Sequence, residues 1–333
     1  MGTRLPFRVL VSAPDFGRVG ETALRMLRDA GCEVTTNPGD TLGEDDLIAL
    51  IGEADAVIAG VEPITARVLA AAPRLKIVAR RGVGYDTVAL EAATARGVVV
   101  TITAGALAET VADHTMGLIL AVVRRIPELD RLVRSGGWDR IPSVDVWGKT
   151  LGIVGFGAIG RAVAKRAAGF DMRILAHDIR PDPATATAMG VTLTDLDSLL
   201  TQSDIVTVHV PLTPQTRGLI GAAALRRMKP TAYLVNTSRG PVVDEAALLA
   251  ALREGRLAGA ALDVFQHEPP RDRALASLPN VVATPHVASH TVETLARMER
   301  ACAEAVLAVM HGQRPAHVVN PEVYDRRPTT PAS

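Results

Sequence analysis

The stretch TLGIVGFGAIGRAVAKRAAGF, residues 150–170, contains the glycine pattern that decides the fold class. Gly155, Gly157 and Gly160 follow an apolar run typical of a buried strand and open a segment with helical periodicity. In that context the first glycine permits a tight turn, the second lets backbone approach a pyrophosphate, and the third lets helix and strand pack closely. The helix N-terminus would offer its N–H groups to the phosphates. We therefore predict a strand–turn–helix unit that binds a dinucleotide.

An acidic residue lies near the expected offset from this pattern. Asp178 ends the next strand-like run, RILAHD, eighteen residues after Gly160. A carboxylate there accepts hydrogen bonds from the adenosine ribose and repels a 2′-phosphate, which favours NAD over NADP. Arg180 follows two residues later and could pair with such a phosphate, so it works against this preference. A glycine turn that binds no nucleotide is the alternative interpretation.

Short apolar runs alternate with helical segments along the rest of the chain. FRVLVS, DAVIAG, LKIVAR and GVVVT precede a long apolar helix, AETVADHTMGLILAVVRRI. The glycine pattern is followed by five further apolar runs, MRILAHD, DIVTVHV, AYLVNT, LAGAALDVF and NVVATPH. A last helix is expected from about Thr291 to Met310. Such alternation predicts parallel sheets covered by helices on both faces.

Composition limits the kinds of protein this can be. The 333 residues suffice for two domains, and 48% hydrophobic with 22% charged residues is typical of a soluble globular protein. A net charge of zero and 3% aromatics give no sign of nucleic-acid binding. Cys32 and Cys302 fit no redox or ligand spacing, and His286 and His290 lack the glutamate of a helical metal motif, so no metal is expected. With no membrane span and no signal peptide indicated, we expect a cytoplasmic protein.

Three polar side chains follow three of the later strand-like runs. Arg239 comes after AYLVN, Glu268 after GAALDVF, and His286 after NVVATP. Ligands bind at the carboxyl ends of strands in an open α/β sheet, so these residues are candidates for one site. A carboxylate favours a protonated histidine, and an arginine fork suits a planar carboxylate. Taken singly, they also fit a surface ion pair, a turn residue and a core histidine respectively.

Four separated motifs carry a resemblance to a known family. They are the glycine pattern, NTSRGPVVDEAALLAAL, GAALDVFQHEPP and VVATPHVASHT, in this order. Over nearly its whole length the sequence resembles the D-isomer-specific 2-hydroxyacid dehydrogenases. The resemblance implies an α/β protein with two doubly wound parallel-sheet domains. A Rossmann NAD-binding domain, residues 105–289, would be inserted in a flavodoxin-like substrate domain formed by residues 1–104 and 290–333.

The resemblance also implies a reaction and the residues that perform it. Hydride would pass between the nicotinamide of NAD and C2 of a 2-hydroxy or 2-oxo acid. His286 would be the acid/base, Glu268 would orient and charge it, and Arg239 would bind the carboxylate and carbonyl oxygen of the substrate. The main-chain N–H groups of Val83 and Gly84, in RRGVGYDT, would grip the same carboxylate.

Two sets of binding residues are therefore expected. The cofactor set comprises Gly155, Gly157, Ala158, Ile159, Gly160, Asp178, Val210, Pro211, Thr216, Thr237, Ser238, Asp263 and His286. The substrate set comprises Arg80, Arg81, Val83, Gly84, Arg140 and Arg239.

Departures from the family pattern concern the substrate more than the reaction. Thr87 stands where many members have asparagine, and Leu107 and Ala108 remove polar groups. Arg80 and Arg140 match positions that resemble arginines of phosphoglycerate dehydrogenase, whereas Arg81 is additional.

These arginines support the hypothesis that the substrate carries a second anion, a phosphate or phosphonate, because arginine forms paired hydrogen bonds with phosphate. The alternative is that they are solvated or pair with neighbouring aspartates.

The resemblance further implies a homodimer. In the family, the helix beginning near Leu107 packs across a two-fold axis, and the face MGLILAVV is very apolar for a solvated helix. Burial within one chain is the alternative. The rival function is a non-catalytic NAD-sensing protein of the same fold, similar to a corepressor, which need not keep Arg239, Glu268 and His286. An amino-acid dehydrogenase of similar layout would lack the Glu-then-His order.

Overall fold

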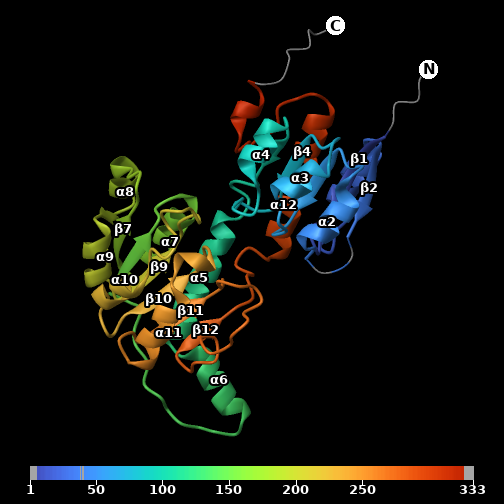
Figure 1. The fold of residues 1–333 in the computed structure, drawn as a ribbon. Helices are drawn as coiled ribbons and strands as arrows, with labels where there is room; N and C mark the ends of the chain where they lie inside the picture. The colour runs from blue at the N-terminus through green and yellow to red at the C-terminus, as the bar shows by residue number, and fades with distance from the viewer. Residues whose placement is uncertain (1–5, 38, 40, 326–333) are drawn as a thin grey trace, which may run out of the picture. The chain divides into compact units, whose positions relative to one another are not determined.

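The chain divides into two compact units (Figure 1). The computed structural model describes residues 6–37, 39 and 41–325. Unit 1 comprises residues 1–107 and 291–333, and unit 2 comprises residues 108–290. The domain boundaries expected from the sequence are 104/105 and 289/290, a few residues from these, and the expected domain ends at residues 1 and 333 lie outside the described residues.

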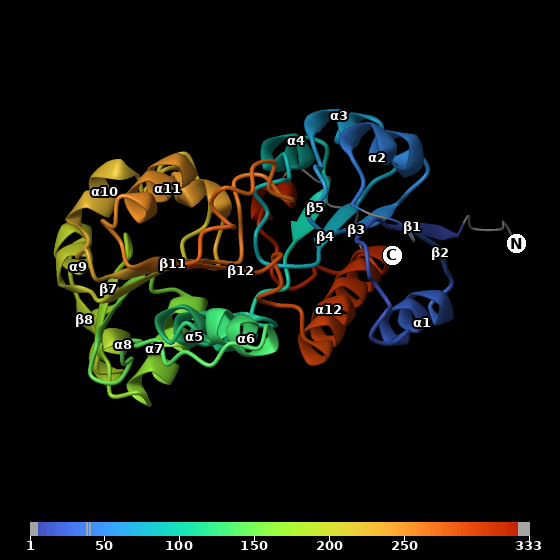
Figure 2. The same ribbon diagram turned by 90° about the horizontal axis from the view of Figure 1, so that it is seen from below.

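Unit 1 is a parallel sheet of five strands with helices on both faces. The strand order is β2-β1-β3-β4-β5, with β1 Phe7–Val11, β2 Cys32–Thr36, β3 Ala56–Ala59, β4 Ile77–Arg80 and β5 Val99–Thr101. One face carries α1 Thr22–Asp29 and α12 Val292–Met310, and the other carries α2 Glu44–Ile51, α3 Ala66–Ala70 and α4 Leu90–Ala95 (Figure 2). A short 3-10 helix, η2, covers Pro321–Val323. This strand order is that of the flavodoxin-like fold, as expected.

Unit 2 is a parallel sheet of seven strands in the order β12-β11-β10-β9-β6-β7-β8. The strands are β6 Thr150–Val154, β7 Arg173–His177, β8 Thr192–Leu193, β9 Ile205–Val208, β10 Tyr233–Asn236, β11 Gly259–Leu262 and β12 Val281–Ala283. The helices are α5 Ala108–Val123, α6 Ile126–Arg134, α7 Ala158–Ala168, α8 Pro183–Ala188, α9 Leu196–Gln202, α10 Ala222–Arg227 and α11 Glu245–Arg253, with the 3-10 turn η1 Gly240–Val242. Numbered within the unit and read from β8, the order is 3-2-1-4-5-6-7, whose first six strands have the Rossmann order, and this confirms the predicted fold class.

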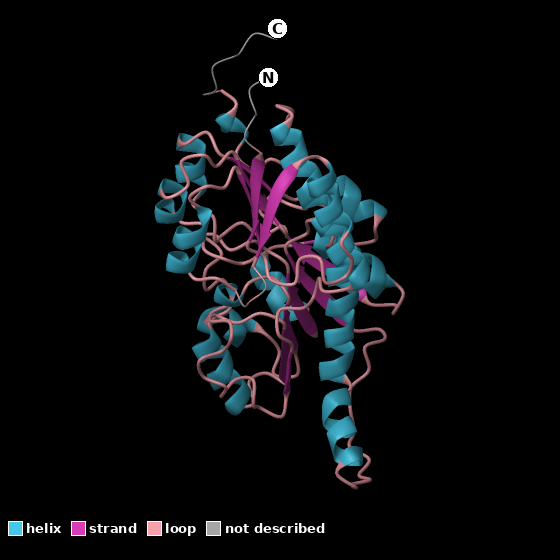
Figure 3. Cartoon of the chain, turned by 90° about the vertical axis from the view of Figure 1, so that its right-hand side faces the viewer, coloured by secondary structure: helices cyan, strands magenta, loops and turns pink. Residues whose placement is uncertain are grey.

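Helices enclose the strands of both sheets (Figure 3). Strands β3, β4, β6, β9 and β11 are buried along their whole length. Both faces of such a strand are covered, so its sequence is a mainly apolar run rather than an alternating one. That is why these strands are evident in the sequence.

Two edge strands are not evident in the sequence. β2 exposes most of its residues, and β8 has only two residues. Because an edge strand is covered on fewer sides, it needs no apolar run, and the hydrogen bonds to its neighbour are what define it.

The long apolar helix differs from expectation in two ways. It ends at Val123 instead of continuing to residue 126, since Arg125 adopts a left-handed conformation with φ of 56° and α6 starts afresh at Ile126. In addition, the face containing Met116 and Ile119 is buried inside unit 2, in one hydrophobic cluster with α7 and the sheet. Because this face of α5 is buried by its own chain, its apolar character gives no support for a homodimer. The alternative, burial within one chain, is what the structure shows for this face.

Among the described residues, no helix combines the length and the apolar composition that a membrane span requires.

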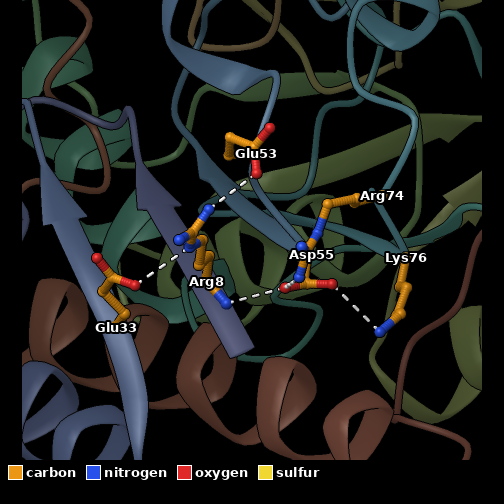
Figure 4. Close-up of polar contacts among 6 residues, drawn as sticks. All are labelled: Arg8, Glu33, Glu53, Asp55, Arg74 and Lys76. Carbon is orange, nitrogen blue, oxygen red and sulfur yellow. Dashed lines mark hydrogen bonds and ion pairs between the residues drawn. The ribbon is translucent and has the colours of Figure 1, made fainter. Parts of the chain in front are cut away.

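A charged cluster closes the amino-terminal edge of the sheet in unit 1 (Figure 4). The Asp55 carboxylate is 3% exposed and accepts hydrogen bonds from the Arg8 amide at 3.0 Å and Arg74 at 2.9 Å, with Lys76 at 3.2 Å. Burial raises the pKa of Asp55, but the Arg8 amide, Arg74 and Lys76 together outweigh burial and hold the pKa below its ordinary value. Asp55 thus ties β1 to the start of β4.

We predict that Asp55→Asn lowers the free energy of unfolding by about 1.5–3 kcal/mol at pH 7, the range for hydrogen bonds to a charged group. A depressed carboxyl pKa contributes stability above the unfolded pKa of about 3.9, and that stability is lost as the pH falls through the folded pKa. The difference between wild type and variant in urea unfolding should therefore shrink below about pH 4.

Glu33→Gln serves as the control, because Glu33 contacts Arg8 from an exposed position and exposed ion pairs contribute about 1 kcal/mol or less. An Asp55→Asn variant as stable as Glu33→Gln at pH 7 would contradict the role of Asp55.

Candidate active site

The glycine turn after β6 has the geometry that a dinucleotide requires. Gly155 has φ of 97°, and a Cβ there would lie 2.7 Å from the His209 carbonyl oxygen. A Cβ on Gly160 would overlap the carbonyl of Gly155, so the start of α7 packs directly on the turn. Gly157, in contrast, is exposed and has no atom within 4 Å of its Cβ position. The backbone is therefore open at the one glycine where a pyrophosphate must approach.

Asp178 is fixed beside this turn. One carboxylate oxygen accepts a hydrogen bond from the Phe156 amide at 2.7 Å, and the other accepts from the Arg180 amide at 2.8 Å. The carboxylate thus orders the peptide between the first two glycines as well as the segment after β7. Ala158 and Ile159 begin α7, so their N–H groups belong to its first turn. This set of groups fits the adenosine and pyrophosphate parts of NAD.

The loop after β9 is held by a threonine pair. The Thr216 hydroxyl donates to the Pro211 carbonyl at 2.7 Å and accepts from the Thr213 amide at 2.8 Å. Val210 and Pro211 therefore lie in an ordered loop at the carboxyl edge of the sheet. Between β6 and β9 the strand order reverses, and this is the point at which α/β sheets bind ligands.

His209 is a neutral histidine at the same edge. Burial lowers its pKa to about 3, and its ring contacts Thr207 Oγ1 at 2.9 Å and Thr237 Oγ1 at 3.5 Å. Thr237 in turn lies 3.1 Å from Thr115 Oγ1 on α5. This chain of hydroxyl groups links the ends of β9 and β10 to α5.

Glu268 and His286 form a direct pair. Glu268 Oε2 lies 2.6 Å from His286 Nδ1, and Glu268 Oε1 accepts from the Phe265 amide at 3.0 Å. A carboxylate at Nδ1 places a proton on that nitrogen and leaves Nε2 for exchange with a substrate. His286 itself has φ of 55°, an uncommon conformation for a residue with a side chain, so the turn that carries it must be held by other contacts.

Those contacts come from Asp263, which is fully buried. Its Oδ1 accepts from Thr284 Oγ1 at 2.6 Å and the Val287 amide at 2.9 Å, and its Oδ2 accepts from the Ala288 amide at 2.9 Å. Burial raises the pKa of Asp263, but hydrogen bonds, with His114 first, reverse this and lower it. Both oxygens thus serve the turn of His286, and a direct contact between Asp263 and the nicotinamide stays a prediction.

The turn that presents Arg239 is organised by a buried amide. Asn236 donates to the Arg239 carbonyl at 2.9 Å and accepts from the amide and hydroxyl of Ser238 at 3.0 and 2.7 Å. A Cβ on Gly240 would overlap the carbonyl of Phe265, the residue whose amide binds Glu268. The turns of Arg239 and Glu268 are therefore packed against each other, backbone on backbone.

Several of these supporting residues are not evident as site residues in the sequence. Asn236 and Gly240 lie inside the motif NTSRG. Their closeness to Arg239 in the sequence was the feature that could have identified them as supporting residues of the site. His114, whose Nε2 lies 3.2 Å from Thr284 Oγ1, comes from α5 and has no local signal. Among the described residues, no group of three His, Cys, Asp or Glu side chains could hold a metal ion.

The expected substrate residues outside this group lie in different surroundings. Arg80 ends β4 and is followed by Arg81, and both are buried within unit 1. Val83 and Gly84 are half-buried in the loop after β4, and Arg140 is exposed in the connector after α6. The burial of Arg80 and Arg81 argues against their service as open phosphate ligands.

Comparison with known proteins agrees with this fold. A family model described as D-isomer specific 2-hydroxyacid dehydrogenase, NAD binding domain, matches residues 116–288. A glyoxylate reductase of Thermofilum pendens is 44% identical over 321 residues, which cover 93% of this chain and 94% of the relative. A D-3-phosphoglycerate dehydrogenase of Methanocaldococcus jannaschii is 39% identical over 317 residues, covering 94% of this chain and 59% of the relative. The solved TT0316 protein of Thermus thermophilus superposes with a TM-score of 0.87 at 42% identity, covering 94% of this chain and 99% of that one.

The fold and the site define an NAD-dependent oxidoreductase. The chain belongs to the D-isomer-specific 2-hydroxyacid dehydrogenase family, whose enzymes transfer a hydride between NAD and C2 of a D-2-hydroxy acid or the matching 2-oxo acid.

The position of Asp178 predicts a preference for NADH over NADPH, because a 2′-phosphate would meet a fixed carboxylate. We expect kcat/KM with NADH to exceed that with NADPH at least tenfold, about 1.4 kcal/mol. Asp178→Ala should narrow this ratio, with some loss of NADH binding because the glycine turn loses its acceptor.

Asp182→Ala is the matched control, since Asp182 is also close to the turn but pairs with Arg161. Equal kcat/KM values for the two cofactors in the wild type would contradict the prediction.

Proposed function

We propose that the enzyme reduces small 2-oxo acids, with glyoxylate as the first candidate, to the corresponding 2-hydroxy acids. The contact of 2.6 Å between Glu268 and His286 carries the proposal, because it supplies an acid/base at the end of a nucleotide-binding sheet. The glyoxylate reductase of Thermofilum pendens, similar along almost its whole length, supports the choice of substrate.

The side chains have separate roles in the proposed reaction. NADH supplies the hydride when it is bound. His286 enters protonated and gives its Nε2 proton to the oxygen that forms at C2, and general acid catalysis of this kind contributes about 10²–10⁴-fold. Glu268 stabilises the charged imidazole through Nδ1. Arg239 binds the substrate carboxylate as a two-pronged donor and stabilises charge on the adjacent oxygen.

We also propose that the N–H groups of Val83 and Gly84 bind the substrate carboxylate. The proposal is supported by their place in a glycine-containing loop. The remaining cofactor residues of the expected set are likewise proposals. A protein that only senses NAD would need neither the Glu268–His286 contact nor the buried carboxylate of Asp263 behind it, and the whole arrangement therefore favours catalysis.

A homodimer is part of the proposal, on a surface different from the expected one. In unit 2, α6 buries none of its residues and exposes Ile126 and Val133. The connector that follows exposes Val144 as well as Trp138 at 78% and Trp147 at 70%. Large contiguous apolar patches on a surface commonly mark a protein interface, and we propose that these side chains form one. A monomer mass by light scattering at micromolar concentration would exclude the dimer.

The cytoplasm is the proposed compartment. Both cysteines, Cys32 and Cys302, are buried and free, and burial raises the pKa of the Cys302 thiol to about 12, so neither is suited to redox exchange. Fractionation of the native host followed by immunodetection would test this assignment.

His286→Ala should reduce kcat for glyoxylate by about 10²–10⁴-fold, the usual contribution of a general acid. NADH binding, measured by fluorescence titration, should persist because the glycine turn and Asp178 do not depend on His286. His290→Ala, four residues along the same segment, is the matched control and should keep most of the turnover. Unchanged kcat in His286→Ala across a panel of 2-oxo acids would remove the acid/base role.

A further inference from the structure

One side chain of α5, His114, reaches the strand end that carries His286. His114 Nε2 lies 3.2 Å from Thr284 Oγ1 and 3.5 Å from Asp263 Oδ1. Thr284 directly follows β12 and precedes His286 by two residues. His114 and Thr284 are 170 residues apart in the sequence, so this contact exists only because α5 packs beside the carboxyl end of β12.

The direction of each hydrogen bond in this group follows from its donors and acceptors. The amides of Val287 and Ala288 donate to the two carboxylate oxygens of Asp263, as they would to an ionised carboxylate. An ionised carboxylate only accepts, so the single proton of the Thr284 hydroxyl points to Asp263 Oδ1, at 2.6 Å. The Thr284 oxygen can then only accept from the ring of His114, which must carry a proton on Nε2.

This donated hydrogen bond supports the backbone that carries His286. Asp263 is fully buried, and the His286 amide donates to its carbonyl at 2.8 Å. His286 has φ of 55°, and a residue with a side chain keeps such a conformation only where the surrounding contacts fix it. His114 holds the Thr284 hydroxyl on one side of this turn, and Asp263 holds it on the other.

The two neighbours of His114 on α5 have other partners. Thr115 Oγ1 lies 3.1 Å from Thr237 Oγ1, and the Asp113 carboxylate accepts from Arg166 at 2.6 Å in an exposed position. Of these three consecutive residues, His114 is the one that contacts the turn of His286. Its contact is therefore separable by mutation from the other contacts of this stretch of α5.

We propose that His114 is a positioning residue for the reduction: through Thr284 and Asp263 it fixes the turn of His286 and so keeps the imidazole against Glu268. The inference deepens the proposed function and rests on it. Because His114 acts as a donor from Nε2, the property that matters is an N–H group at that place.

Two variants of His114 separate the donor from the rest of the side chain. His114→Leu removes the donor and should lower kcat for glyoxylate by about 10–10²-fold, since a displacement of about 1 Å at a reacting group can cost 10²-fold. KM should change much less, because Arg239 is held by Asn236 and not by this turn. His114→Gln offers an amide N–H near the place of Nε2 and should restore most of the turnover.

A double variant tests whether His114 acts through Thr284. Thr284→Val removes the hydroxyl that links His114 to Asp263, so it should lower kcat by itself. His114→Leu combined with Thr284→Val should be no slower than Thr284→Val alone, because the contact is already lost. Losses of kcat that multiply in the double variant would show that His114 does not act through Thr284, and the proposal would be wrong.

Asp113→Asn is the matched control, since it changes the preceding residue at an exposed ion pair and should leave kcat unchanged. A lower melting temperature of His114→Leu with wild-type kcat would mean that His114 only supports the fold, which overturns the proposal. So would a His114→Gln variant as slow as His114→Leu.

His114→Asn keeps the test decisive if His114→Leu does not fold. Its amide is one methylene shorter and ends short of Thr284, so turnover should fall well below that of His114→Gln. Equal turnover of these two variants would overturn the inference alone. If the wild type binds NADH but reduces no 2-oxo acid, the proposed function fails instead, and the inference fails with it.

Discussion

Parallel pairing of β9, β10, β11 and β12 is the constraint on which the active site depends. The four strands run in the same direction and in continuous register, so their carboxyl ends meet at one edge. His209, Arg239, Asp263 and His286 all follow these strands, although they are far apart in the sequence. A ligand at this edge is therefore reached by side chains that the crossover helices separate along the chain.

Polar side chains at the strand ends convert this convergence into a defined geometry. Asp263 binds the turn of His286, Asn236 binds the turn of Arg239, and Asp178 binds the glycine turn. In each case the side chain lies at or just after the end of a strand. It accepts a hydrogen bond from a backbone N–H group of the turn, or donates one to a backbone carbonyl of the turn. Such turns need support because they use unfavourable backbone conformations, such as the left-handed one at His286.

Unit 1 illustrates that the presence of an arginine does not define a substrate. The sequence suggests Arg80 and Arg81 as phosphate ligands, yet each interacts with groups of its own unit. Relatives named glyoxylate reductase and phosphoglycerate dehydrogenase match the chain at 44% and 39% identity, so overall similarity separates the two substrate classes poorly. The partners of the arginines carry the more specific information.

The sequence by itself determined the fold class and the glycine turn, and it predicted Arg239, Glu268 and His286 as site residues, because each depends on a local pattern or on the order of motifs. Buried strands such as β9 were predictable, since burial on both faces requires a mainly apolar run. Only the tertiary structure decided that the apolar face of α5 is covered by its own unit, and that Arg80 and Arg81 are internal. The sequence does not reveal what covers an apolar helix face or an arginine, because the covering groups come from distant parts of the chain. The face of α5 is covered by α7, and Arg81 is paired with Glu299.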